Sequence, residues 1–116
     1  MDYKDKPFEK RKNDCQKIRK KHPHKLPVIV TKEKSSKYKI LEKEKYMIPD
    51  DITVGQFQAI IRKRLELAPE YSLFFFINGR IMPKQDSLLQ DVFERNKNDD
   101  GFLYIEYSEE RDKGSN

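Results

Sequence analysis

Cys15, His22 and His24 are the side chains that could serve as a nucleophile or a general base. A catalytic cysteine needs a histidine within hydrogen-bonding reach and a third group that orients that histidine. Cys15 shares a narrow apolar stripe with Phe8 and Ile18, which favours a buried thiol, and no orienting group is indicated. One Cys and two His fall short of a four-ligand zinc site, and only 4 Gly leave no phosphate-binding glycine loop. These residues predict no enzyme activity, no metal site and no cofactor.

The basic side chains are concentrated in the N-terminal part of the chain. Residues 1–45 hold 16 Lys and Arg against 7 Asp and Glu, a net charge of +9, whereas residues 46–116 hold 9 against 13, a net charge of −4. Such a segment attracts nucleic acid, anionic lipid, acidic cytoskeletal tails or acidic peptides, and charge alone does not choose among them. Phe74-Phe75-Phe76 lacks the Gly and basic residues of an RNA-binding strand. We therefore expect no specific nucleic-acid partner, and any nucleic-acid binding should be weak and salt-sensitive.

Length and composition limit the chain to one compact domain of 116 residues, with a small core rich in its 7 Phe and 6 Tyr. The longest apolar run, Leu73 to Ile77, is far shorter than the roughly 20 residues of a membrane-spanning helix. The charged start of the chain predicts no secretory signal. A single cysteine forms no internal disulfide, which fits a reducing compartment, so we expect a cytoplasmic protein.

The first half of the chain has the pattern of a helix, a hairpin and a second helix. Pro7 opens a helical segment that ends before Pro23. The β-branched run 26–30 and the run 45–48 predict two strands, which the polar loop 32–44 joins as a hairpin. Residues 53–65 repeat apolar side chains at helical spacing, with Thr53 as the N-cap, and predict the most regular helix.

The second half completes a mixed sheet. The uninterrupted apolar run 73–77 predicts a strand buried on both faces, residues 88–93 a short helix and residues 102–107 a last strand. This order predicts an α+β fold, a ubiquitin-like β-grasp with a four-stranded mixed sheet packed on a central helix and an extra N-terminal helical segment. We divide the single domain into the helical segment 1–24, the core 25–107 and a flexible tail 108–116, which has no apolar residue.

Several stretches resemble one known family in their order and spacing. They are Pro7-Phe8-Glu9-Lys10-Arg11, Lys17-Ile18-Arg19-Lys20-Lys21, Pro27-Val28-Ile29-Val30, Tyr46-Met47-Ile48-Pro49, Thr53-Val54-Gly55-Gln56-Phe57, Ile61-Arg62-Lys63-Arg64, Leu73-Phe74-Phe75-Phe76-Ile77-Asn78 and Gly101-Phe102-Leu103-Tyr104-Ile105-Glu106-Tyr107-Ser108. From about Tyr3 to Gly114 the chain resembles the ATG-eight family of autophagy ubiquitin-like modifiers, most closely its GABARAP branch.

The resemblance implies a modifier whose C-terminal glycine is joined to phosphatidylethanolamine on autophagosomal membranes. It implies a processing cysteine protease that cuts after Gly114 and removes Ser115-Asn116, followed by activating and conjugating enzymes. A residue without a Cβ suits a narrow active-site channel. Family members usually carry an aromatic residue before this glycine, whereas this chain has Asp112-Lys113. The alternative is therefore a peptide-binding adaptor of the same fold that is not lipidated.

The resemblance also implies binding of peptides with an aromatic residue, two spacers and an aliphatic residue. Alternation along 45–48 lets one strand edge serve two pockets. The implied aromatic pocket consists of Asp14, Ile18, Pro27, Ile29, Lys45, Met47 and Phe102. The implied aliphatic pocket consists of Tyr46, Ile48, Pro49, Ile52, Phe57 and Ile60. The acidic flanks of the peptide would meet Lys25, Lys43, Lys45 and Arg64.

Some of these residues have a plain structural explanation. Ile52, Phe57 and Ile60 lie on or beside a helix's apolar face and are expected in the core, whereas Ile18 and Tyr46 are apolar positions among charges and are the sharper indicators of a site. The implied partners are receptors and adaptors that carry such motifs, the processing and conjugating enzymes, the lipid membrane and microtubules. The implied location is the cytoplasm, and autophagosome membranes and cytoplasmic vesicles after lipidation.

Overall fold

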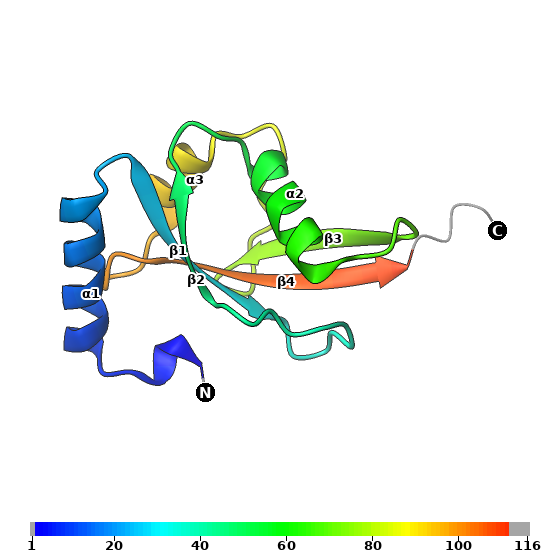
Figure 1. Cartoon of the computed structure of the whole chain (residues 1–116), viewed down its shortest axis with the longest axis horizontal. Coiled ribbons are helices and arrows are strands. Elements are labelled where there is room, and N and C mark those ends of the chain that lie inside the picture. The colour runs from blue at the N-terminus through cyan, green and yellow to red at the C-terminus, as the bar shows by residue number, and fades with distance from the viewer. Residues whose placement is uncertain (1, 112–116) are drawn as a thin grey trace.

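The structure, a computed structural model, describes residues 2–111, and the side chain of Arg111 is not part of this description. In chain order the elements are the short 3-10 helix η1 (Tyr3–Asp5), α1 (Phe8–Lys21), β1 (Lys25–Lys32), β2 (Lys45–Pro49), α2 (Val54–Leu65), β3 (Tyr71–Ile77), α3 (Leu89–Asn96) and β4 (Leu103–Arg111). The strands form one sheet in the order β2-β1-β4-β3 (Figure 1). Within residues 2–111, no helix is both long and apolar enough to cross a membrane.

The sheet is mixed, as the sequence predicts. β1 pairs antiparallel with β2 and parallel with β4, and β4 pairs antiparallel with β3. The expected hairpin, the central helix and the ubiquitin-like β-grasp are therefore confirmed. This strand order leaves β2 and β3 as the two edge strands.

The main core fills the space between α2 and one face of the sheet. Phe57 and Ile61 of α2 have no exposed surface, and the Phe57 ring packs on Phe75 with 5.4 Å between centroids. Thr53 caps α2: its Oγ1 accepts from the backbone N–H of Gln56 at 3.1 Å, while Gln56 Oε1 accepts from the Thr53 N–H at 2.8 Å. This reciprocal capping box fixes where α2 begins relative to the core.

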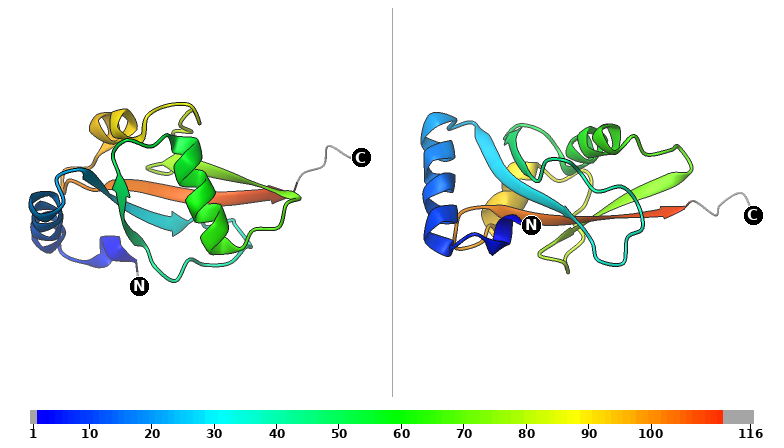
Figure 2. Two further views of the ribbon diagram at one scale, coloured as in Figure 1. Left: turned by 45° about the horizontal axis from the view of Figure 1, so that its top comes forward. Right: turned by 60° about the horizontal axis from the view of Figure 1, so that its bottom comes forward.

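A smaller core lies on the opposite face, where α1 packs near one end of the sheet (Figure 2). Alternation along β1 divides the two cores, because Val28 and Val30 belong to the main one and Ile29 to the smaller one. Of the narrow apolar stripe that the sequence predicts in α1, Cys15 and Ile18 are buried, whereas Phe8 in the first turn is 40% exposed. The sequence's thin supply of apolar residues is thus shared between two faces.

Two expectations about the later strands are wrong. β3 is not buried on both faces: Leu73, Phe75 and Ile77 are buried, whereas Phe74 and Phe76 are half-buried, because β3 is an edge strand and α2 covers only one of its faces. The free tail does not begin at residue 108 either. β4 continues to Arg111 because its backbone pairs with β3, which needs no apolar side chains.

Candidate functional site

The edge strand β2 carries five of the residues that the sequence assigns to peptide binding, Lys45 to Pro49. β1 occupies one side of β2, and the other side has no neighbouring strand in residues 2–111. Tyr46 and Ile48 are buried, whereas Lys45 is half-buried and Met47 is 39% exposed, so the expected alternation along β2 holds. An exposed edge can accept an extended peptide as an additional strand, with alternate side chains directed to the two faces of the sheet.

The seven residues assigned to the aromatic pocket lie together on the α1 face of the sheet. Ile18, Ile29 and Phe102 are in the smaller core, and Pro27 and Ile29 of β1 stand opposite Met47 and Lys45 of β2. Phe102 has no exposed surface and Ile29 only 1%. A peptide ring can therefore reach Met47 directly, but it meets the deeper apolar residues only if the surface above them opens.

Two of these seven residues form an ion pair that joins α1 to β2. Lys45 Nζ donates to Asp14 Oδ2 at 2.8 Å, and the Tyr3 hydroxyl donates to the same oxygen. Burial pushes the pKa of Asp14 upward, but the hydrogen bonds from Lys45 and Tyr3 outweigh it and hold the pKa below its usual value. Asp14 therefore stays ionised and keeps Lys45 drawn toward α1.

Sequence reasoning missed the part that Tyr3 plays in this site. Its ring packs edge-on against Phe102 with 5.1 Å between centroids, and its backbone N–H donates to Glu44 Oε1 at 2.8 Å. Burial and the hydrogen bond with Asp14 raise the pKa of the Tyr3 hydroxyl, which stays protonated as a donor. Tyr3 is an apolar position among charges, the same signal that singled out Ile18 and Tyr46.

The residues assigned to the aliphatic pocket divide into buried and accessible ones. Tyr46, Ile48 and Phe57 belong to the main core, and Phe57 has no exposed surface, so it supports the site from beneath. Pro49 is exposed and Ile60 is 37% exposed, so these two can be touched from solvent. Ile52 is partly buried and packs against the main core.

Basic side chains cover the buried ring of Tyr46. Lys43 Nζ and the Arg64 guanidinium carbon lie 5.4 and 5.5 Å from the ring centroid. The Tyr46 hydroxyl is buried and has no hydrogen-bond partner among the described residues, and burial raises its pKa. Lys25, at the start of β1, is exposed opposite Pro49. Of the four assigned cations, Lys45 pairs with Asp14, whereas Lys25, Lys43 and Arg64 form no ion pair in residues 2–110. These three suit contacts with acidic peptide flanks.

A second ion pair anchors α1, and with it the aromatic pocket, to the loop before β4. Arg11 Nη1 donates to Asp100 Oδ2 at 2.6 Å and to the Tyr104 hydroxyl at 3.1 Å. The Asp100 side chain is fully buried and also accepts from the Phe102 N–H at 2.9 Å. Because every charge in this network is satisfied, it fixes the position of α1 over the sheet.

Replacing Gly101 by Ala should destabilise this anchor strongly. Gly101 has φ +94°, and a Cβ there would lie 2.6 Å from Cys15 Sγ. Backbone strain and the clash together predict a loss of about 2–4 kcal/mol in the free energy of unfolding, measured by urea denaturation. The double variant Gly101→Ala with Cys15→Ala should recover part of this loss, because only the clash is relieved. Equal stability of Gly101→Ala and the parent would contradict the packing described here.

The surroundings of Cys15 are those of a buried structural thiol. It is 3% exposed, and burial together with the charge of Asp100 raises its pKa to about 11. Neither His22 nor His24 is hydrogen-bonded to it, and the nearest partner of His24 Nδ1 is Asp50 Oδ2 at 3.8 Å. No group of three or more His, Cys, Asp or Glu suited to a metal ion occurs in the part of the chain that the structure describes.

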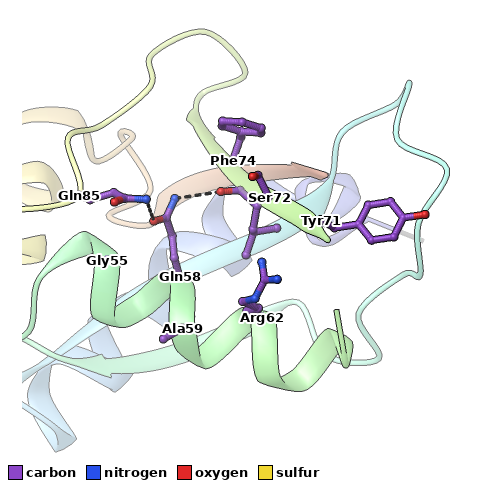
Figure 3. A pocket seen from close by; sticks show the side chains of 9 residues that line it. Gly55, Gln58, Ala59, Arg62, Tyr71, Ser72, Phe74 and Gln85 are labelled. Atoms are coloured by element: carbon purple, nitrogen blue, oxygen red, sulfur yellow. Dashed lines mark hydrogen bonds between the residues drawn. The ribbon is translucent and has the colours of Figure 1, made fainter. Parts of the chain in front are cut away.

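The other edge strand borders a cavity of about 370 Å³ between α2 and β3 (Figure 3). Gln85 Nε2 donates to Gln58 Oε1 at 2.9 Å, and Gln58 Nε2 reaches the Leu73 carbonyl at 3.4 Å (Figure 3). These glutamines partly satisfy the outer edge of β3, which discourages non-specific strand pairing there. None of the assigned site residues lines this cavity.

Comparison with known proteins identifies the family. The family model described as "Autophagy protein Atg8 ubiquitin like" matches residues 10–114. "Autophagy-related protein 8" of Schizosaccharomyces pombe is 46% identical over 108 residues, which are 93% of this chain and 88% of that protein. "Autophagy-related protein 8" of Coccidioides immitis is 44% identical over 109 residues, which are 94% of this chain and 92% of that protein.

A solved structure of an ATG8 protein also matches this chain. The crystal structure of Trypanosoma brucei ATG8 has a TM-score of 0.88 and 36% sequence identity, and the match covers 95% of this chain and 94% of that one. These relatives support the family and do not resolve the GABARAP-like branch. The chain therefore belongs to the Atg8 family of ubiquitin-like autophagy proteins.

Proposed function

We propose that this chain is processed after Gly114, joined to phosphatidylethanolamine on autophagosomal membranes, and there recruits receptors and adaptors with aromatic-x-x-aliphatic motifs. Gly114 lies outside the described residues, and its assignment rests on the resemblance and on the family match, which ends at this residue. The proposed partners are the motif peptides, a processing cysteine protease, activating and conjugating enzymes, the lipid membrane and microtubules. The proposed location is the cytoplasm and, after lipidation, autophagosomes and cytoplasmic vesicles.

The free edge of β2 is the observation that carries the peptide-binding half of the proposal. A motif peptide would add as a strand along Lys45–Pro49. Its aromatic side chain would enter on the Met47 face after the Lys45–Asp14 pair yields, and its aliphatic side chain would lie on Pro49 and Ile60. The side-chain exposure of Lys45 and Asp14, 39% and 30%, supports an ion pair that can rearrange at small cost.

Reconstitution tests the lipidation half. The full chain is incubated with a family processing protease, activating and conjugating enzymes, ATP and vesicles containing phosphatidylethanolamine. We expect a vesicle-bound product whose linkage forms at Gly114. A chain that binds motif peptides but stays unconjugated would favour the adaptor alternative, for which the charged Asp112-Lys113 pair is the specific observation.

Raising the salt concentration should slow association with an acidic-flanked motif peptide much more than it accelerates dissociation. Lys25, Lys43 and Arg64 act mainly on the encounter, and charges farther apart than about 8 Å are screened at physiological ionic strength. Stopped-flow mixing at several salt concentrations measures both rate constants. The same peptide with neutral flanks is the control and should show little salt dependence. Association rates that ignore salt for the acidic-flanked peptide would contradict a steering role for these cations.

A further inference from the structure

The end of β4 changes neighbours just before the tail begins. β1 pairs with β4 only as far as Lys32 opposite Tyr107, whereas β3 continues to pair with residues 109–111. Beyond Tyr107 the side of β4 that β1 has left is therefore open to another partner. The loop between β1 and β2, residues 33–44, lies beside this half of β4 (Figure 2).

Two residues of this loop region hold β4 through Glu109. Ser36 Oγ lies 2.8 and 2.7 Å from the two Glu109 carboxylate oxygens, and the Lys37 N–H donates to Oε1 at 3.2 Å. Ser36 is only 7% exposed although it is polar, which shows that the loop is packed down at this point. We call Ser36 and Glu109 the tail clamp.

Further contacts seat the same loop on β4. The Glu33 N–H donates to the Tyr107 carbonyl at 2.8 Å, and the Leu41 N–H donates to the Tyr107 hydroxyl at 3.1 Å. The ring of Tyr38 packs on Tyr71, the residue of β3 that stands opposite Arg111, with 5.4 Å between centroids. The loop therefore contacts both strands that meet at the last described residue.

We propose that the tail clamp positions the C-terminal tail for processing at Gly114; this inference rests on the proposed function. Gly114 is three residues beyond Arg111, so its Cα can be at most about 11 Å from that of Arg111. If β4 ended at Ser108, this limit would be about 22 Å. We propose that the clamp keeps residues 109–111 of β4 paired with β3. The distance from the end of the sheet to Gly114 then stays short.

A fixed starting point aids docking into the protease because less chain must be ordered on binding. Loss of the clamp should therefore raise KM and leave kcat for cleavage nearly unchanged. Neither clamp residue is proposed to touch the scissile bond or the catalytic centre of the protease. Ser36 and Glu109 are accordingly positioning residues.

The first arm of the test measures order at the end of β4 without the protease. Ser36→Ala should make the amide hydrogens of residues 109–111 exchange about tenfold faster, equivalent to about 1.4 kcal/mol of local opening. Ser35→Ala is the matched control, because Ser35 is exposed and its side chain contacts Glu33, and it should leave these rates unchanged. Unchanged exchange in Ser36→Ala would overturn the clamp.

The second arm measures cleavage of a reporter fused after Asn116 of the full chain. Ser36→Ala should lower kcat/KM about threefold to tenfold through KM, and Ser36→Thr, which keeps the hydroxyl, should restore it. Glu109→Ala, which removes the acceptor oxygens, should resemble Ser36→Ala, whereas Glu110→Ala should behave as the parent. Equal kcat/KM in Ser36→Ala and Ser35→Ala, or a fall confined to kcat, would overturn the positioning role. A parent chain that is not cut after Gly114 would instead contradict the proposed function.

Discussion

Replacing Gly114 by Ala is expected to abolish conjugation to phosphatidylethanolamine while leaving the fold and peptide binding intact. A residue that must thread a narrow active-site channel and react through its carboxyl group has little room for a Cβ. Residues 112–116 contain no apolar side chain that the core could lose. The lipidated band in cells or in reconstitution measures the first effect, and the thermal midpoint measures the second.

Ser115→Ala is the control for this variant, because Ser115 belongs to the proposed removable end and should be lost before conjugation. It should be lipidated to the same extent as the parent. Undiminished lipidation of Gly114→Ala would remove Gly114 from its assigned role. Loss of lipidation together with a lowered thermal midpoint would point to unfolding and would also contradict the expectation.

Replacing Met47 by Asp should weaken binding of a motif peptide from the micromolar toward the millimolar range. A buried aromatic ring covers roughly 150–250 Å², a gross gain of about 4–6 kcal/mol at about 25 cal/mol per Å². Micromolar binding corresponds to about 8 kcal/mol, so strand pairing and the aliphatic contact must contribute the rest. Met47 is 39% exposed at the point where the ring must enter, and a carboxylate there opposes its burial.

Calorimetry with the peptide and with its aromatic-to-Ala counterpart measures this effect, and both changes should reduce affinity similarly. Met82→Asp is the matched control, because Met82 is a 56% exposed methionine beyond β3, away from the edge of β2. Ile60→Ala should cause a smaller loss through the aliphatic side chain. Unchanged affinity in both Met47→Asp and Ile60→Ala would contradict the two-pocket assignment and favour the basic surface as the principal site.

The sequence predicts most of the fold because its strongest signals are local. The helical spacing and Thr53 cap define α2, and the two apolar runs around the loop 33–44 define the hairpin. The end of β4 could not be predicted in this way, since residues 108–111 are polar and form a strand only through pairing with β3. The apolar run of β3 predicts burial on both faces, but composition does not show that this strand lies at the edge of the sheet.

The sequence predicts which positions make up the candidate site, but not which of their side chains are exposed or what they contact. Met47 and Lys45 face one side of β2 as period-two alternation requires. The sequence could not show that Phe57 has no exposed surface, or that the Tyr3 hydroxyl and Lys45 both bind Asp14. Asp14 is 11 positions from Tyr3 and 31 positions from Lys45, and Phe57 is buried by packing against the sheet. Such contacts between distant residues are not visible in the local sequence pattern.

The mass of the protein recovered from its own cells tests the central claim most directly. We expect two species, one that ends at Gly114 and one that ends at Gly114 with a phosphatidylethanolamine adduct in the membrane fraction. Enrichment of autophagosomal membranes should increase the second species. A chain that retains Ser115-Asn116 and carries no lipid in every fraction would contradict the modifier function.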